Sequence, residues 1–284
     1  MPGPGTGLAE AKSFYDDYVE EHVPYHRSPQ GLKRAILQRL PYWSYCEWRF
    51  WEKWVPRCDA LLDLGCARGR EVFREKANCA IGVDLAHRAL ADCVAHYDGA
   101  ALASMTDLPF PDESFDCVVT SHVLGHVPPA AKPAVFAEVA RVLKPGGRSV
   151  HVIETDSARS LIQTAKQHPN LYQRRILDPD GHVGLEPASQ ALERFKQNEL
   201  HPVAVEKMEV RNLHPRLWVK WFDNEYSHLD REIGEAVDRA KRTLGTPIWL
   251  ACEEIALGRQ RYTSEQDAPL DEAMFIAAAL EKRG

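Results

Sequence analysis

The sequence predicts an α/β fold built on a mostly parallel sheet, and two observations carry that prediction. After Pro56, short apolar runs alternate with segments of helical spacing, which is the pattern of βαβ units. Residues 61–70 form an apolar run that ends in an acid and then turns through two glycines. Such a segment is typical of a buried strand that leads into a helix where α/β sheets bind nucleotide-like ligands.

Before residue 155 the apolar runs predict five strands. They are residues 60–64, 80–83, 100–103, 116–120 and 149–153. Helices are expected from near residue 68, over 86–96 and over 130–143, with a tight turn at 144–147 before the fifth strand. The crossovers between these strands should be right-handed, as parallel sheets require.

Beyond residue 155 the pattern is weaker. Helical spacing predicts a helix over 188–199 and a helical region over 228–258 that breaks at 245–247. Alternating valines predict a strand over 202–210. The apolar run over 273–280 fits a terminal strand or an alanine-rich helix, and we favour the strand.

The part of the chain before Pro56 is rich in aromatic residues and predicts a helical cap. Residues 8–22 and 30–55 have helical spacing interrupted by prolines. Most of their rings should pack in the core or the cap. We therefore expect residues 1–55 to form a leader and helical cap. Residues 56–284 should form the main domain, with a helical insertion at about 211–270 as its lid.

Composition limits the classes of partner. The net charge is −6 with acids and bases interspersed, so no broad phosphate-binding surface is expected. Apolar runs are too short for a membrane span, and the N-terminus lacks the pattern of a signal peptide. The seven cysteines have no paired spacing, which favours reduced thiols in a cytoplasmic protein. Four scattered histidines, His22, His26, His182 and His214, lack metal-ligand spacing, and no metal site is expected.

The glycine loop and an acid that follows it form the first candidate site. Gly65 and Gly69 follow Asp63, the last acid of the first strand. Asp84 ends the second strand, where a carboxylate can accept both hydroxyls of a ribose. The alternative reading of Asp84 is a favourable acid at a helix N-terminus. A dinucleotide-binding loop fits less well, because Ala67 stands at the middle glycine and Asp63 would repel a pyrophosphate.

Three segments together resemble the class I S-adenosylmethionine-dependent methyltransferases. They are residues 61–70, 104–116 and 120–126, and the resemblance spans roughly residues 57–155. It implies a Rossmann-like seven-stranded sheet with an antiparallel last strand and helices on both faces. It also implies the cofactor S-adenosyl-L-methionine at the carboxyl ends of the strands. Ala67 and Ser104 depart from the family pattern, which has a glycine and an acid at these positions.

The resemblance implies a cofactor site assembled from strand ends, the glycine loop and the N-terminal segment. Ser104 would accept a hydrogen bond from adenine, Met105 would pack on the purine, and a tyrosine of the N-terminal segment would bind the methionine carboxylate. The implied residues are Tyr15, Tyr18, Asp63, Gly65, Cys66, Ala67, Gly69, Asp84, Leu85, Ser104, Met105, Thr106, Ser121 and His122.

Three histidines are candidate catalytic residues. His122 and His126 lie one helical turn apart after the fourth strand, and His182 lies in a glycine-punctuated loop after the fifth. Each can act as a general base near neutral pH, or can merely cap a helix and orient a loop. Glu154 ends the fifth strand and either orients a substrate or only terminates that strand.

The expected function is transfer of a methyl group from S-adenosylmethionine to an O, N or C nucleophile of a small molecule. Two alternatives stay open. One is a methyltransferase that acts on tRNA or protein, and the other is a protein that binds the cofactor without this activity. No nucleic-acid or membrane partner is expected, and the chain should be a monomer or a homodimer.

Overall fold

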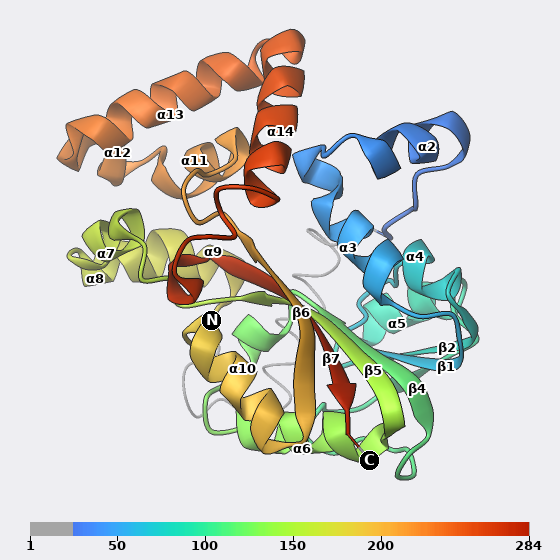
Figure 1. The fold of residues 1–284 in the computed structure, drawn as a ribbon. Helices are drawn as coiled ribbons and strands as arrows, with labels where there is room; N and C mark the ends of the chain where they lie inside the picture. The colour runs from blue at the N-terminus through green and yellow to red at the C-terminus, as the bar shows by residue number, and fades with distance from the viewer. Residues whose placement is uncertain (1–24, 284) are drawn as a thin grey trace.

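The computed structural model describes residues 25–283 and contains a seven-stranded sheet with helices on both faces (Figure 1). The strand order is β3-β2-β1-β4-β5-β7-β6. Neighbouring strands are parallel except that β7 runs antiparallel to β5 and β6, so the predicted fold is confirmed. The strands are β1 (Cys58–Leu64), β2 (Ala77–Asp84), β3 (Gly99–Leu102), β4 (Phe115–Ser121), β5 (Leu143–Glu154), β6 (Leu200–Met208) and β7 (Phe275–Lys282).

Helices connect and cover these strands. Those before β6 are α2 (Gly31–Arg39), α3 (Cys46–Trp54), α4 (Glu71–Arg74), α5 (His87–Cys93), α6 (Lys132–Val142), α7 (Ser160–Lys166), α8 (Pro169–Tyr172), α9 (Asp178–Asp180) and α10 (Ala188–Gln197). Between β6 and β7 lie α11 (Pro215–Phe222), α12 (Glu225–Leu229), α13 (Arg231–Leu244) and α14 (Pro247–Arg261). Short 3-10 or π turns are η1 (Trp43–Tyr45), η2 (Leu124–His126), η3 (Gln173–Leu177) and η4 (Leu270–Glu272).

Both faces of the sheet are buried, as alternating side chains of a strand require. Leu61 packs in the cluster that contains α3, α4 and α5, whereas Leu62 packs in the cluster that contains α6 and α10. Neither side chain is exposed, so each burial contributes roughly 1.5–3 kcal/mol. The continuous apolar runs noted in the sequence are therefore strands covered on two sides (Figure 1).

The strand order reverses direction at β1, which pairs with β2 on one side and with β4 on the other. At such a reversal the connections leave the sheet on opposite faces and open a crevice beyond the carboxyl ends of the strands. The loops after β1, β2, β4 and β5 all start at this edge. The topology therefore fixes where a ligand can bind before any side chain is considered.

A helical cap lies beyond this edge (Figure 1). It has its own apolar cluster, which includes Trp221, Phe222 and Tyr226 of α11 and α12. The N-terminal helices join it, because Ser44 donates hydrogen bonds to both carboxylate oxygens of Glu254 in α14, at 2.6 and 2.8 Å. The helical region expected over 228–258 is confirmed with its break, whereas the segment 8–22 lies outside the described residues.

Two local expectations differ from the structure, and three short helices were not expected. The helix expected near residue 68 is a single turn, α4, which begins at Glu71. The turn expected at 144–147 belongs to β5 as an irregularity, because the pairing with β4 jumps from Leu143 to Arg148. Sequence patterns also did not predict α7, α8 and α9, whose lengths of seven, four and three residues are too short to show helical periodicity.

No helix within residues 25–283 is long and apolar enough to span a membrane.

Substitution of Phe195 tests the core between the sheet and α10. Its ring is fully buried and lies 4.5 Å, centroid to centroid, from the rings of Phe136 and His151. Phe195→Ala should lower the free energy of unfolding by about 3–5 kcal/mol in chemical denaturation. The control Leu229→Ala removes a side chain that is 58% exposed and should change it by less than about 0.5 kcal/mol. Equal effects of the two changes would contradict this packing.

His151 makes the core sensitive to acid. It is fully buried between Thr120 and Ser149, and burial lowers the pKa of its imidazole to about 3. The unfolded chain binds this proton near pH 6.5, so the contribution of His151 to stability falls as the pH drops from about 6.5 toward 3. In an NMR titration the imidazole of His151 should remain neutral at about pH 5, where an ordinary solvated imidazole is protonated. A His151 titration near pH 6.5 would contradict the assignment.

Candidate active site

A cavity of about 2240 Å³ lies at the carboxyl edge of the sheet. Its walls are the loops after β1, β2, β4 and β5, the loop after α9, and the cap helices α2, α3, α11 and α14. Pockets for one small ligand typically measure about 300–1,000 Å³. The cavity is therefore large enough for two ligands side by side.

The glycine loop forms the floor of the cavity. Gly65 and Gly69 have φ of +69° and +86°, in the left-handed region that glycine adopts without strain. A Cβ atom on Gly65 would lie 2.4 Å from Cγ2 of Val123, so the position has no room for a side chain. Ala67, between them, has φ of +46° and also lines the cavity.

Asp84 fastens this loop to the end of β2. Its Oδ2 accepts a hydrogen bond from the backbone N–H of Ala67 at 2.7 Å, and its Oδ1 accepts one from Ala86 at 2.8 Å. Asp84 and the neighbouring Leu85 also line the cavity. Each carboxylate oxygen has a second lone pair, so the same group can hold the loop and accept a ligand hydroxyl.

Asp63 lies beneath the loop and is almost fully buried. The hydroxyl of Tyr97 donates to its Oδ2 at 2.7 Å, and the same hydroxyl accepts from the N–H of Arg70 at 2.9 Å. Burial raises the pKa of Asp63 to about 7 despite the hydrogen bond. A cation bound beside Asp63 would favour the carboxylate form. Tyr97 was missed from the sequence, because 34 residues separate it from Asp63.

A second wall comes from the ends of β3 and β4. Ser104, Met105 and Thr106 line it, and the hydroxyls of Ser104 and Thr106 lie 2.7 Å apart. Ser121 lines the cavity as well, and its buried Oγ has no hydrogen-bond partner within residues 25–283. A buried hydroxyl without a partner is uncommon, so this atom is available to a ligand.

His122 connects the sheet to the N-terminal helices. Its Nδ1 donates to Oε1 of Glu154 in β5 at 2.9 Å, and its Nε2 donates to Oε1 of Glu47 in α3 at 2.8 Å. Burial opposes the charge on the ring, but the two carboxylates outweigh it and raise the pKa of His122 to about 10. The ring is an imidazolium ion at neutral pH, on a backbone with φ of +55°.

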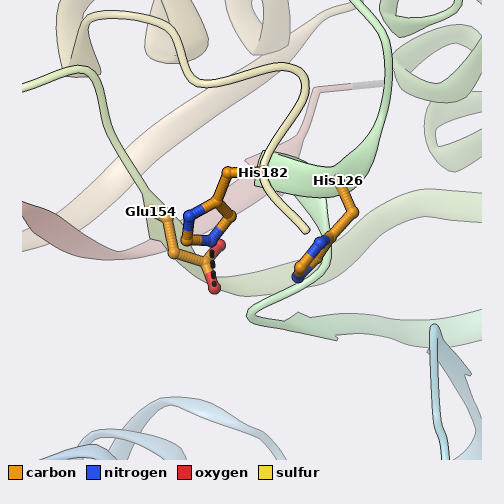
Figure 2. Close-up of side chains that lie close together, drawn as sticks. All are labelled: His126, Glu154 and His182. Atoms are coloured by element: carbon orange, nitrogen blue, oxygen red, sulfur yellow. Dashed lines mark ion pairs between the residues drawn. The ribbon is translucent and has the colours of Figure 1, made fainter. Parts of the chain in front are cut away.

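His126 and His182 form a cluster with Glu154, the same carboxylate that accepts from His122 (Figure 2). Oε1 of Glu154 lies 4.0 Å from Nε2 of His182, and the two imidazole rings lie 5.0 Å apart, centroid to centroid. Burial lowers the pKa of His126, which is therefore neutral at pH 7. The three residues come from η2, the end of β5 and the loop after α9.

Backbone contacts hold this cluster in place. The carbonyl of Gly125 accepts hydrogen bonds from the N–H groups of Val183 and Gly184 at 3.2 and 2.9 Å. The loop is also fixed by Asp180, which accepts from Lys220 at 2.5 Å and from the indole N–H of Trp221 at 3.1 Å. The loop that carries His182 thus rests on η2 and is tied to cap helix α11.

The described candidate residues from the sequence all line this one cavity. Tyr15 and Tyr18 lie outside the described residues. Besides Tyr97, sequence analysis missed Glu47, whose role follows only from its contact with His122, 75 residues away.

A comparison with protein families supports the class of the domain. Residues 62–151 match the model of a family described as a methyltransferase domain. The strand order and the antiparallel last strand are those of the class I fold. These residues therefore match a methyltransferase domain within a chain that has the class I fold, which confirms the resemblance noted in the sequence.

Relatives of known sequence act on different substrates. Over 122 residues the chain is 32% identical to a demethylmenaquinone methyltransferase of Symbiobacterium thermophilum, covering 35% of this chain and 48% of that protein. Over 133 residues it is 26% identical to a tRNA (carboxymethyluridine(34)-5-O)-methyltransferase of Arabidopsis thaliana, covering 43% and 33%. The chain spans 63%, 39% and 48% of the lengths of three curated relatives, so the similarity concerns part of each protein.

Similar structures support the fold. A geranyl diphosphate C-methyltransferase from Streptomyces coelicolor superposes with a TM-score of 0.54 at 17% identity, covering 98% of this chain and 100% of that one. A Haloferax volcanii structure, a complex of the Trm112 methyltransferase activator with a methyltransferase, gives 0.55 at 16% identity, covering 95% and 98%. At these identities the likeness concerns the fold alone.

Gly65→Ala tests the loop against a matched control. The new Cβ would clash with Val123, which should displace the loop and weaken binding of S-adenosylhomocysteine by roughly tenfold or more, equivalent to about 1.4 kcal/mol. Gly146 has a similar φ of +72°, but a Cβ there would meet no atom within 4 Å, and it lies far along β5 from the cavity. Gly146→Ala should therefore keep the affinity in calorimetry. Equal affinities of both variants would contradict the proposed tight fit.

Proposed function

We propose that this protein transfers the methyl group of S-adenosylmethionine to an O, N or C nucleophile of a small molecule. The observation that carries the proposal is the cavity itself, which joins the glycine loop of the methyltransferase domain to a wall built by the helical cap. When bound, the cofactor supplies an electrophilic methyl group on a positively charged sulfur. The protein itself has to bind and orient the cofactor and the acceptor and to exclude water from them.

The residues at the floor fit this cofactor better than a dinucleotide. Asp63 and Asp84 offer carboxylates for an ammonium group and for ribose hydroxyls, whereas two acids would repel a pyrophosphate. Ser121 also lines the cavity, and its buried hydroxyl has no hydrogen-bond partner among the described residues. We assign the cofactor to the wall formed by the glycine loop, Asp84, the segment 103–106 and Ser121.

The acceptor would lie between this floor and the cap. Apolar side chains predominate on the cap side, including Leu37, Trp48, Leu217, Trp221 and Leu250. These residues favour an acceptor with an apolar body, whose reacting end faces the histidines at the strand ends. The apolar cap side of the cavity and the net charge of −6 speak for a small molecule rather than for RNA.

The three histidines are proposed to have different roles. His122 is held as an imidazolium between two carboxylates, so we assign it to positioning: it joins α3 to β5 beside the methyl-transfer site. His126 is neutral at pH 7, and His182 lies beside Glu154. We assign these two to the part of the cavity that faces the reacting end of the acceptor and favours its deprotonated form.

Calorimetric titration with S-adenosylmethionine, S-adenosylhomocysteine and NADH tests the cofactor. Binding of the two adenosyl ligands at micromolar concentrations, without NADH binding, would support the proposal. Incubation with radiolabelled S-adenosylmethionine and either bulk tRNA or a panel of apolar hydroxylated and aminated small molecules then separates the two acceptor classes. Label in the tRNA alone would contradict a small-molecule acceptor, and absence of adenosyl binding would contradict the cofactor site.

Asp84→Ala should weaken binding of S-adenosylhomocysteine by about 1–3 kcal/mol, because a half-buried acceptor for the ribose hydroxyls is lost. Asp98→Ala is the matched control: Asp98 also accepts a backbone N–H, from Ala80 at 2.9 Å, but does not line the cavity. Its affinity should stay unchanged in calorimetry. Unchanged affinity of a folded Asp84→Ala protein would contradict the ribose contact.

A further inference from the structure

The cluster of His126, Glu154 and His182 has the composition and geometry of a metal site. Each residue offers one ligand atom, and the three atoms lie within 4.8 Å of one another. Figure 2 shows the carboxylate end of Glu154 close to the ring of His182, with the ring of His126 beside them. The three residues are far apart in the chain, which is why their spacing did not predict a metal site.

A second observation points to a ligand at this place. Glu154 is 6% exposed, and its Oε1 is engaged with His122. Its Oε2 is buried and has no hydrogen-bond partner within residues 25–283. A buried carboxylate oxygen without a donor is costly, and a cation beside it would compensate that cost.

The surroundings of His126 prepare it as a ligand. Its Nδ1 donates to the carbonyl of Gly181 at 3.1 Å, because a carbonyl can only accept. This hydrogen bond places the ring proton on Nδ1 and the lone pair on Nε2. Ligand histidines in metal sites are commonly oriented in this way, by a carbonyl or carboxylate at the other ring nitrogen.

We propose that His126, His182 and Glu154 bind one divalent transition-metal ion, whose remaining positions face the acceptor in the cavity. Two imidazoles and one carboxylate suit Zn²⁺, Fe²⁺ or Mn²⁺ and leave positions open for an oxygen atom of a second ligand. The proposal rests on the proposed function in one respect: the acceptor would then be a molecule that presents a hydroxyl or similar oxygen to the ion. All three side chains line the cavity from which such an acceptor would approach.

The required movement is small. Bonds of about 2.0–2.2 Å to nitrogen and oxygen place the ligand atoms of a tetrahedral site roughly 3.4 Å apart. The three ligand atoms now lie within 4.8 Å of one another, so binding requires them to approach by about an ångström. Rotation of the two imidazole rings can provide this shift. The backbone beneath them is already held, because the N–H groups of Val183 and Gly184 both donate to the carbonyl of Gly125.

Metal binding by tag-free, chelator-treated protein tests the assignment. Co²⁺ serves as the probe because it follows the ligand preferences of this series and absorbs visible light when bound. Wild type should bind one Co²⁺ per chain, measured by calorimetry and by the absorption band. His126→Gln and His182→Gln should each weaken this binding at least about 100-fold, because losing a ligand exceeds the 10–100-fold effect of losing an outer contact. The matched control is His228→Gln, which removes an exposed histidine on α12 and should leave binding unchanged.

Titration of every variant with S-adenosylhomocysteine separates this proposal from the proposed function. Retained binding of that ligand shows that a variant is folded, so its loss of Co²⁺ reports on the metal ligands. Absence of stoichiometric Co²⁺ binding by wild type, or binding that survives both ligand substitutions, would overturn the metal site and leave the cofactor assignment intact. Stoichiometric Co²⁺ binding without S-adenosylhomocysteine binding would support the metal site and overturn the proposed function.

Discussion

The ion pair between the partly exposed His122 and the buried Glu154 is the contact on which the arrangement of the cavity depends. A buried charge without a partner is costly, so Glu154 requires the imidazolium of His122, and Glu47 completes the chain from α3. Through this chain the N-terminal helices are fastened to the ends of β4 and β5. The left-handed backbone of His122, with φ of +55°, persists because these contacts hold the ring on both sides. The carboxylate that anchors His122 is also the one that faces His182.

The proposed cofactor and acceptor sides of the cavity are built by different means. On the cofactor side, backbone and short side chains are held by local bonds, such as those from Ala67 and Ala86 to Asp84. On the acceptor side, contacts join segments far apart in the chain, such as Asp180 to Lys220 and Trp221. The first kind lies within a βαβ unit, whereas the second kind exists only where the loop after α9 meets α11.

This difference explains how much could be predicted from the sequence. Strand ends and the glycine loop follow from local patterns, so Asp63, Gly65 and Asp84 could be placed at one edge without a structure. Tyr97 and Glu47 could not, because what defines their roles is a partner 34 or 75 residues away. The cluster around Glu154 was missed for the same reason: Glu154 and His182 were each noticed, but only the docking of the loop on Gly125 brings them together. The helices α7 to α9 were missed because they are too short to show a period.

The difference between the two sides of the cavity also affects which methyl acceptor is bound. The match to the methyltransferase family covers residues 62–151 and therefore contains the glycine loop, Asp84 and His126, but ends before Glu154 and His182. Relatives that share the matched part include enzymes named for a quinone precursor and for a tRNA nucleoside. A shared cofactor floor is compatible with such unlike acceptors because the acceptor wall comes from α2, the segment after β5 and the helices between β6 and β7. Under the proposed assignment, the chemistry that distinguishes this chain from its relatives resides in that wall, where Glu154 connects the end of the sheet to the loop that carries His182 and, through His122, to α3.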